Sequence, residues 1–256
     1  MIKIRYAVID TAAMFKRCML LSVRNYDVLI TSILLPVMMM LLFVYLFGGA
    51  INVGDIDYVN YVVPGVIVLS IGYCAAVTSV SINTDMTRGI IDRFRSMPIS
   101  QSSILTGHVL ASVARNYLST ILVIAVAVAI GFRPVAGFME WVIVAGILLL
   151  YMLVITWFAV LFGLIAKTAD GAGTFSFFIL FFPYLSSGFV PTDTMPMVLR
   201  VVSKNQPLTP IIESLRSLLM RSAIDQHLLP AVLWCVGLLT VACTASIQIY
   251  RRKAKV

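Results

Sequence analysis

Several long stretches of this sequence contain no Asp, Glu, Lys or Arg. Two of them lie between Glu140 and Lys167 and between Asp225 and Arg251. A helix needs about 20 mainly apolar residues to cross the hydrocarbon core of a bilayer, and both stretches are longer than that. A soluble fold could not bury such runs, because 61% of the 256 residues are hydrophobic and only 12% are charged. The chain is therefore expected to be an integral membrane protein.

Six segments are long and apolar enough to cross a membrane. They are Val28–Gly48, Tyr58–Ile82, Ile104–Ile130, Trp141–Ala166, Gly171–Val190 and Leu228–Tyr250. Because they leave no room for a water-soluble domain, residues 1–256 are predicted to form one all-α membrane domain, with six spans between residues 28 and 250. The third segment contains Arg115 and Asn116, a polar pair inside the membrane. We expect Arg115 in the cytoplasmic third of its span, where it reaches water or a neighbouring helix.

The distribution of basic residues predicts the orientation of the chain. With both termini in the cytoplasm, thirteen of the 19 basic residues fall on the cytoplasmic side. They are Lys3, Arg5, Lys16, Arg17, Arg24, Arg88, Arg93, Arg95, Lys167, Arg251, Arg252, Lys253 and Lys255. The sequence therefore predicts a multi-pass protein of the plasma membrane with a basic cytoplasmic tail at 251–256. The net charge of +8 then reflects orientation and contact with anionic membrane lipids, and nucleic acid is not expected as a partner.

Residues 1–27 precede the first span and are predicted to form an amphipathic helix in the plane of the membrane. Apolar residues recur on one face at helical spacing, whereas Arg17 and Arg24 lie opposite. The apolar face consists of Val8, Ala12, Phe15, Met19 and Tyr26. Such a helix is either a lipid anchor or a lever beside a cytoplasmic partner.

The loop between the second and third spans, Asp85 to Pro98, carries the most informative pattern. Ile90, Phe94 and Met97 share one side of a short helix, and charged residues border it. This apolar ridge is typical of a helix that docks into a groove on another protein, although a helix resting on lipid has the same pattern. The residues predicted to make the contact are Arg88, Gly89, Ile90, Ile91, Asp92, Arg93, Phe94, Arg95 and Met97.

The outer segment between the fifth and sixth spans, Pro191 to His227, is too long for a simple turn. Its second half repeats apolar residues on one helical face, at positions 211, 212, 215, 218 and 219. We therefore expect short outer helices that cap this side of the bundle.

The residues that intramembrane chemistry needs are not found in the sequence. None of the six predicted spans contains Asp or Glu, and His108 at the start of the third is interpreted as a surface group. The four cysteines have no metal-binding spacing, so no metal or other cofactor is expected on this chain. A GxxxxGK[ST] phosphate-binding loop is also missing from the sequence. If the protein pumps actively, its energy comes from a partner.

Three sequence motifs together resemble the ABC-2 type permeases, and most of all the daunorubicin-resistance-like drug exporters. They are the run Thr87-Arg-Gly-Ile-Ile-Asp-Arg-Phe-Arg-Ser-Met-Pro-Ile99, the outer run Ser187-Gly-Phe-Val-Pro-Thr-Asp-Thr-Met-Pro196, and Gln206-Pro-Leu-Thr-Pro-Ile-Ile-Glu-Ser-Leu-Arg216. The likeness extends over nearly the whole chain. One departure is Thr87, where family members often have glutamate.

The resemblance implies a permease without enzymatic activity that exports drug-like, amphiphilic or lipid substrates. It also implies a dimer of permeases, identical or different, each touching a separate ATP-binding cassette ATPase that holds ATP and Mg²⁺. The loop around Ile90 to Arg95 would be the coupling helix that contacts this ATPase. Two alternatives stay open: a permease for a cell-surface polysaccharide or its lipid-linked precursor, and a membrane scaffold that transports nothing.

Overall fold

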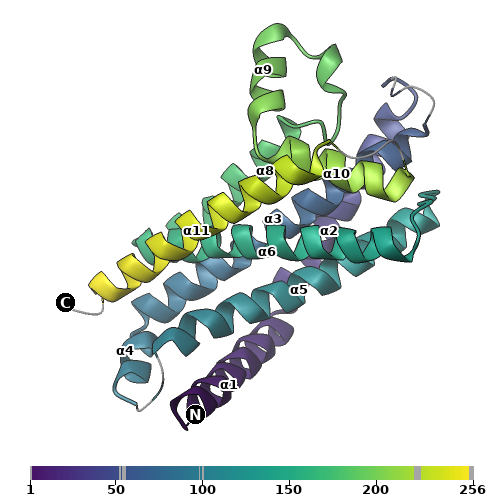
Figure 1. Cartoon of the computed structure of the whole chain (residues 1–256). Coiled ribbons are helices and arrows are strands. Elements are labelled where there is room, and N and C mark those ends of the chain that lie inside the picture. The colour runs from purple at the N-terminus through teal and green to yellow at the C-terminus, as the bar shows by residue number, and fades with distance from the viewer. Residues whose placement is uncertain are drawn as a thin grey trace.

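A computed structural model describes residues 2–51, 53, 56–97, 99, 101–221 and 226–253. Within these ranges all the regular structure is helical (Figure 1). The α-helices are α1 (Ile2–Arg24), α2 (Tyr26–Leu42), α3 (Tyr58–Thr87), α4 (Ile90–Arg95), α5 (Gln101–Ala129), α6 (Phe138–Ile165), α7 (Ala169–Gly173), α8 (Phe175–Tyr184), α9 (Met197–Asn205), α10 (Leu208–Met220) and α11 (Leu228–Lys253). A π-helical turn, η1 (Phe43–Phe47), continues α2, and a 3-10 turn, η2 (Thr192–Thr194), precedes α9.

Five helices of the described chain are long and apolar enough to cross a membrane. They run over Ile30–Phe47, Tyr58–Thr87, Ser102–Ala129, Phe138–Ile165 and Leu228–Lys253. These ranges match the first, second, third, fourth and sixth predicted spans to within a few residues, because long apolar runs dominate the signal. The chain is thus a helical membrane protein, as its sequence predicts.

The fifth predicted span, Gly171–Val190, is not one continuous helix. It is divided into α7 and α8 at Thr174, and α8 ends at Tyr184. The hydroxyl of Thr174 donates to the Gly171 carbonyl at 2.7 Å, a side-chain bond that competes with the helical pattern. Six continuous spans are therefore not seen among the described residues, and a crossing by α7 and α8 stays a prediction.

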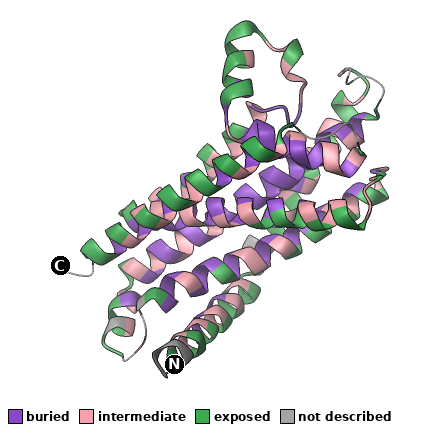
Figure 2. Ribbon diagram, viewed as in Figure 1, coloured by how far each residue is buried: buried purple, intermediate pink, exposed green. Residues whose placement is uncertain are grey.

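Helix α3 is the centre of the bundle. It packs against α2, α5, α6, α7, α8 and α10. Figure 2 shows α3 buried along most of its length, whereas much of α9 and of α11 is exposed. Small residues allow the closest approaches, as expected for helices that pack in a membrane. A Cβ on Gly163 of α6 would lie 2.5 Å from the Ser79 carbonyl oxygen of α3.

Both chain ends and α4 lie at one end of the bundle, which we call the inner end (Figure 1). Helices α9 and α10 lie at the other end, which we call the outer end. The outer helix α10 buries the apolar residues that the sequence pattern selects, including Ile211, Leu215 and Leu219. This arrangement agrees with the topology that the basic residues predict, in which the termini and the loop at 85–98 share one side.

The N-terminal helix α1 packs through a different face from the one its apolar spacing indicates. It runs alongside α5, and its buried residues there are Met14 and Cys18. Val8 is 63% exposed and lies outside this packed face. The close approach depends on Gly107 of α5, where an added Cβ would lie 2.5 Å from the Met14 Cβ. The packed face therefore consists of small and sulfur-containing residues, and the placement of α1 in the membrane plane stays a prediction.

Candidate functional site

Helix α4 is a two-turn element fixed between α3 and α5. Gly89 joins it to α3 with a left-handed backbone, φ +67°, which glycine adopts without the penalty of a Cβ. Ile91 is 1% exposed and belongs to an apolar cluster with residues of five other helices. The cluster comprises Met14, Ile82, Ile91, Ile104, Leu105, Val109, Val160, Leu164 and Tyr250. This cluster links α4 to the packing of α1, α3, α5, α6 and α11.

The predicted apolar ridge of α4 is divided between the bundle and the surface. Ile90 and Phe94 are half-buried, and the Arg17 guanidinium lies 5.3 Å from the Phe94 ring centroid. Met97 is 37% exposed. The ridge is divided because Ile91 anchors the helix and turns the neighbouring side of α4 toward α1.

The exposed surface of α4 is consequently more charged than apolar. Arg88, Asp92 and Arg93 are exposed there. The side chain of Arg95 and the whole of Pro98 lie outside the described residues. A partner that approaches α4 could therefore contact Arg88, Asp92, Arg93 and Met97.

Next to α4, three ionisable side chains meet at the junction of α1, α3 and α5. Arg17 donates to both carboxylate oxygens of Asp85, at 2.7 and 2.9 Å. His108 Nε2 lies 3.1 Å from Asp85 Oδ2, and both residues are at most 5% exposed. The hydrogen bonds that Arg17 donates to Asp85 raise the pKa of the Arg17 guanidinium above its usual value. These bonds join α1 to the two helices that flank α4.

Arg115 and Asn116 are both buried, and they differ in their partners. Arg115 is at the midpoint of α5, and its expected place in the cytoplasmic third of the membrane stays a prediction. Its guanidinium donates to Ser22 Oγ of α1 at 2.6 Å and to Thr78 Oγ1 of α3 at 2.9 Å. The Asn116 amide nitrogen lies 3.4 Å from Ser112 Oγ, and its oxygen has no partner in the described chain. Arg115 thus links three helices, whereas Asn116 bonds within one.

A partly open cavity of about 570 Å³ lies beside Arg115. Its walls come from α1, α2, α3, α5, α7 and α8. Arg17, Arg88 and Arg115 contribute positive charge to the lining, and Asp85 contributes the negative charge. The cavity also reaches Ile90 of α4. A ligand in this cavity would therefore touch the elements that hold α4.

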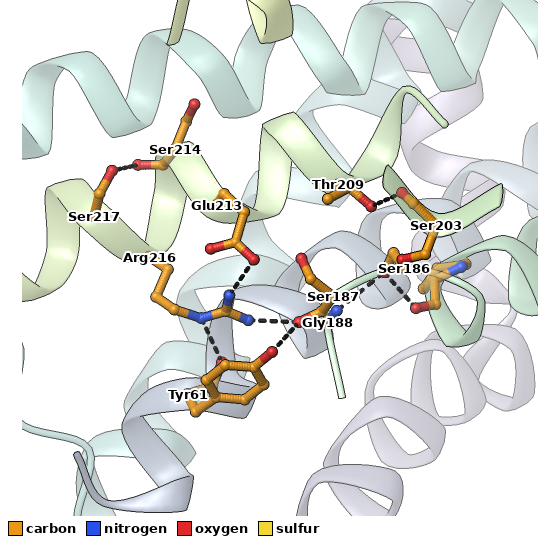
Figure 3. A network of polar contacts seen from close by, with 11 residues as sticks. Tyr61, Ser186, Ser187, Gly188, Ser203, Thr209, Glu213, Ser214, Arg216 and Ser217 are labelled. Carbon is orange, nitrogen blue, oxygen red and sulfur yellow. Dashed lines mark hydrogen bonds and ion pairs between the residues drawn. The ribbon is translucent and has the colours of Figure 1, made fainter. Parts of the chain in front are cut away.

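At the outer end, a second polar cluster is centred on Arg216 of α10 (Figure 3). Its guanidinium donates to the Tyr61 carbonyl at 3.2 Å, to the Ser187 carbonyl at 2.7 Å and to Glu213 at 2.6 Å. It also lies 3.7 Å from the Tyr61 ring centroid. The Tyr61 hydroxyl donates to the same Ser187 carbonyl at 2.8 Å. The cluster fixes α10 and the turn after α8 to the outer end of α3.

The sequence interpretation missed three functional candidates. Asp85 was taken as the start of a loop, His108 as a surface group and Arg216 as an outer loop residue, but all three are buried. For Asp85 a signal was available in the sequence: polar residues occur at Thr78 and Ser79 inside the predicted span and at Asn83 just past its end, so the helix could continue to Asp85 with a polar face. Among the described residues no three His, Cys, Asp or Glu side chains gather as metal ligands would.

The family model of the ABC-2 type transporter matches residues 10–220, which is most of the chain and includes α4 and both clusters. The protein belongs to this family. Among its relatives, the daunorubicin resistance ABC transporter permease protein DrrB1 of Streptomyces coeruleorubidus is 27% identical over 226 residues, 88% of this chain and 80% of that protein.

Two further relatives of this ABC-2 family member cover a comparable part of the chain. The probable doxorubicin resistance ABC transporter permease protein DrrC of Mycobacterium tuberculosis is 24% identical over 98% of this chain and 91% of that protein. The inner membrane transport permease YadH of Escherichia coli is 29% identical over 71% of this chain and 72% of that protein. The chain is therefore an ABC-2 type membrane permease with relatives named for drug resistance.

Proposed function

We propose that this chain is the membrane-spanning subunit of an exporter that moves drug-like, amphiphilic or lipid substrates out of the cell. The proposal rests on the family and on the position of α4, whose Ile91 side chain is buried in an apolar cluster with residues of five other helices. In this proposal α4 is the coupling helix, and a separate ATP-binding cassette ATPase that holds ATP and Mg²⁺ contacts its exposed residues. A second permease, identical or different, completes the transporter.

The anchoring of α4 explains how an ATPase could move the spans. A push on Arg93 or Met97 passes through Ile91 to α5 and α6, and through the Arg17 to Asp85 bonds to α1. For this to drive transport, the ATPase must bind two permease conformations with different affinity, since equal affinity shifts no equilibrium. The charged face of α4 supplies contacts that such a difference in affinity can use.

A charge reversal on the exposed face of α4 tests the docking role. Arg93→Glu removes a surface cation without touching the buried anchor Ile91, whereas a change at Phe94 would also disturb its contact with Arg17. We expect the tagged permease to retain its co-expressed ATPase about tenfold less well, since repulsion of about 1.4 kcal/mol has that effect. Substrate-stimulated ATP hydrolysis in nanodiscs should fall with it.

The control is Lys204→Glu, which reverses a charge on α9 at the outer end, where Lys204 is exposed. It should leave ATPase retention unchanged. Retention and transport that persist at the wild-type level in both Arg93→Glu and Met97→Asp would show that α4 does not dock the ATPase.

Labelling of introduced cysteines tests the predicted orientation. Met97→Cys and Val198→Cys place thiols on exposed positions at the inner and outer ends, 37% and 76% exposed in the native residues. Three of the four native cysteines are buried, so background labelling should be low. A membrane-impermeant maleimide should reach position 198 in intact cells and position 97 only in inverted vesicles. The opposite pattern would contradict cytoplasmic coupling.

A further inference from the structure

The cavity beside Arg115 carries more positive than negative charge. Three arginines and one aspartate line it. The aspartate is fully engaged, because Arg17 bonds both oxygens of Asp85 and His108 contacts one of them. Arg115 therefore has no carboxylate left to pair with among the lining residues. The volume of the cavity, about 570 Å³, is in the usual range for a small-molecule site.

Arg115 itself is an incompletely satisfied buried cation. It is 8% exposed, and in the described chain its Nε atom has no hydrogen-bond partner. Its bonds go to the uncharged hydroxyls of Ser22 and Thr78, and the thiol of Cys74 lies close to it. A buried guanidinium normally pairs with an anion, because burying a charge without one is costly. The missing partner points to a ligand that brings the negative charge.

We propose that this cavity binds the anionic headgroup of an amphiphile, with phosphate as the preferred group and Arg115 as its principal ligand. Arginine suits this role because its planar guanidinium donates two parallel hydrogen bonds to phosphate or carboxylate. Arg88 adds a second positive charge to the cavity wall. Apolar wall residues, including Leu21, Val77 and Val80, offer a surface for the hydrocarbon part.

The binding reaction does not depend on ATP-driven export. Only the interpretation of the bound amphiphile as cargo rests on the proposed function; a resident membrane lipid would use the same contacts. Since the cavity reaches Ile90 of α4, either ligand would sit where it influences the coupling helix. The site assigns a chemical class to the ligand, an anionic amphiphile rather than a neutral or cationic one.

Titration of the purified full chain in detergent with short-chain phosphatidylglycerol tests the site without any ATPase. We expect phosphatidylglycerol to bind about tenfold more tightly than short-chain phosphatidylcholine, whose choline offsets the phosphate charge. Arg115→Gln should abolish this preference. Ser176→Glu keeps Arg115 but adds a carboxylate to the same cavity wall, so it should weaken phosphatidylglycerol binding by a similar factor.

Arg133→Gln is the matched control, because it removes an exposed arginine from the outer end and should leave the preference intact. Displacement of the lipid by excess inorganic phosphate would show that the site recognises phosphate alone, and lipid retention would show that it also needs the acyl chains; both outcomes support an anion site. Equal affinity for the two lipids, or unchanged phosphatidylglycerol binding in both Arg115→Gln and Ser176→Glu, would overturn the proposal. Either of these results would leave the ATPase co-purification experiment unaffected, so the two proposals can fail separately.

Discussion

Two buried arginines, Arg216 near the outer end and Arg115 in the middle of the bundle, have opposite surroundings. Arg216 donates to a carboxylate and two backbone carbonyls and lies against an aromatic ring (Figure 3). Arg115 donates to two hydroxyls, leaves one nitrogen without a partner and faces a cavity. The difference teaches that burial alone does not define a site. A guanidinium whose hydrogen bonds are all made joins helices together, whereas one with an unused donor beside a cavity is available to a ligand.

The same contrast separates rigid from adjustable parts of the molecule. The outer cluster bonds mainly to backbone carbonyls, which cannot move without moving their helices. The inner contacts of Arg115 end on side-chain hydroxyls of α1 and α3, which can rotate to other partners. We therefore expect the contacts of Arg216 to contribute to stability, and those of Arg115 to determine the response to ligand.

The largest change in stability should come from removing Asp85, the acidic group that Arg17 and His108 contact at the junction of α1, α3 and α5. Asp85→Ala leaves Arg17 and His108 without their shared partner, and breaking a buried ion pair costs about 3 to 5 kcal/mol. We expect a loss of that order in the free energy of unfolding, measured by SDS titration in mixed micelles with circular dichroism. Asp170→Asn, which neutralises an exposed carboxylate, is the control. A loss below about 1 kcal/mol would show that the junction of α1, α3 and α5 is held by apolar packing alone.

The second effect addresses the outer cluster directly. Arg216→Met keeps most of the side-chain volume but removes the hydrogen bonds to Glu213 and to the Tyr61 carbonyl. It also leaves the Ser187 carbonyl with the Tyr61 hydroxyl as its remaining side-chain donor. Unsatisfied buried acceptors cost about 1 to 3 kcal/mol each, and partial relaxation should hold the total near 3 kcal/mol. The same unfolding measurement applies. Lipid binding at the inner cavity should be unchanged, so a changed phosphatidylglycerol affinity in this variant would break the proposed division between the two ends.

A third, smaller effect concerns the backbone contact that the outer cluster maintains. Gly65 of α3 lies so close to Gly188 that an added Cβ would be 2.6 Å from the Gly188 carbonyl oxygen. Gly65→Ala should therefore push the turn after α8 away from α3 and cost about 1 to 3 kcal/mol, as overpacking usually does. Gly146→Ala on α6 is the control, since nothing lies within 4 Å of a Cβ there. Equal stability of the two variants would mean that the turn moves freely.

Most of the helical framework could be predicted from the sequence, and the polar clusters could not. Hydropathy predicts the starts of α3 and α11 at Tyr58 and Leu228, because the apolar runs begin there. It ends the second span too early, since Asp85 looks like a loop residue when it is considered alone. The group that makes its burial tolerable, Arg17, is 68 residues away in the sequence. Hydropathy counts the cost of each charge but does not detect a neutralising partner on another helix.

The same reasoning applies to α4 and to the divided fifth segment. The pattern around Ile90 predicts a short amphipathic helix at the right place, but not that Ile91 would be its buried anchor. Within about two turns, neighbouring faces are too close for spacing alone to separate them. The break at Thr174 depends on a hydrogen bond from its hydroxyl to a backbone carbonyl, which a hydropathy average does not detect.

The smallest predicted change in stability is also the most informative. Arg115→Met removes a buried cation that has no anionic partner in the described chain, and replacing poorly compensated buried charges by apolar groups is often neutral or stabilising. We expect the free energy of unfolding to change by less than about 1 kcal/mol in the absence of lipid, in contrast to Arg216→Met. Added phosphatidylglycerol should stabilise the wild type and leave Arg115→Met unaffected, because a ligand that binds only the folded state shifts unfolding by mass action. A loss of about 3 kcal/mol without lipid would instead make Arg115 a structural clamp like Arg216, and the distinction between the two ends would disappear.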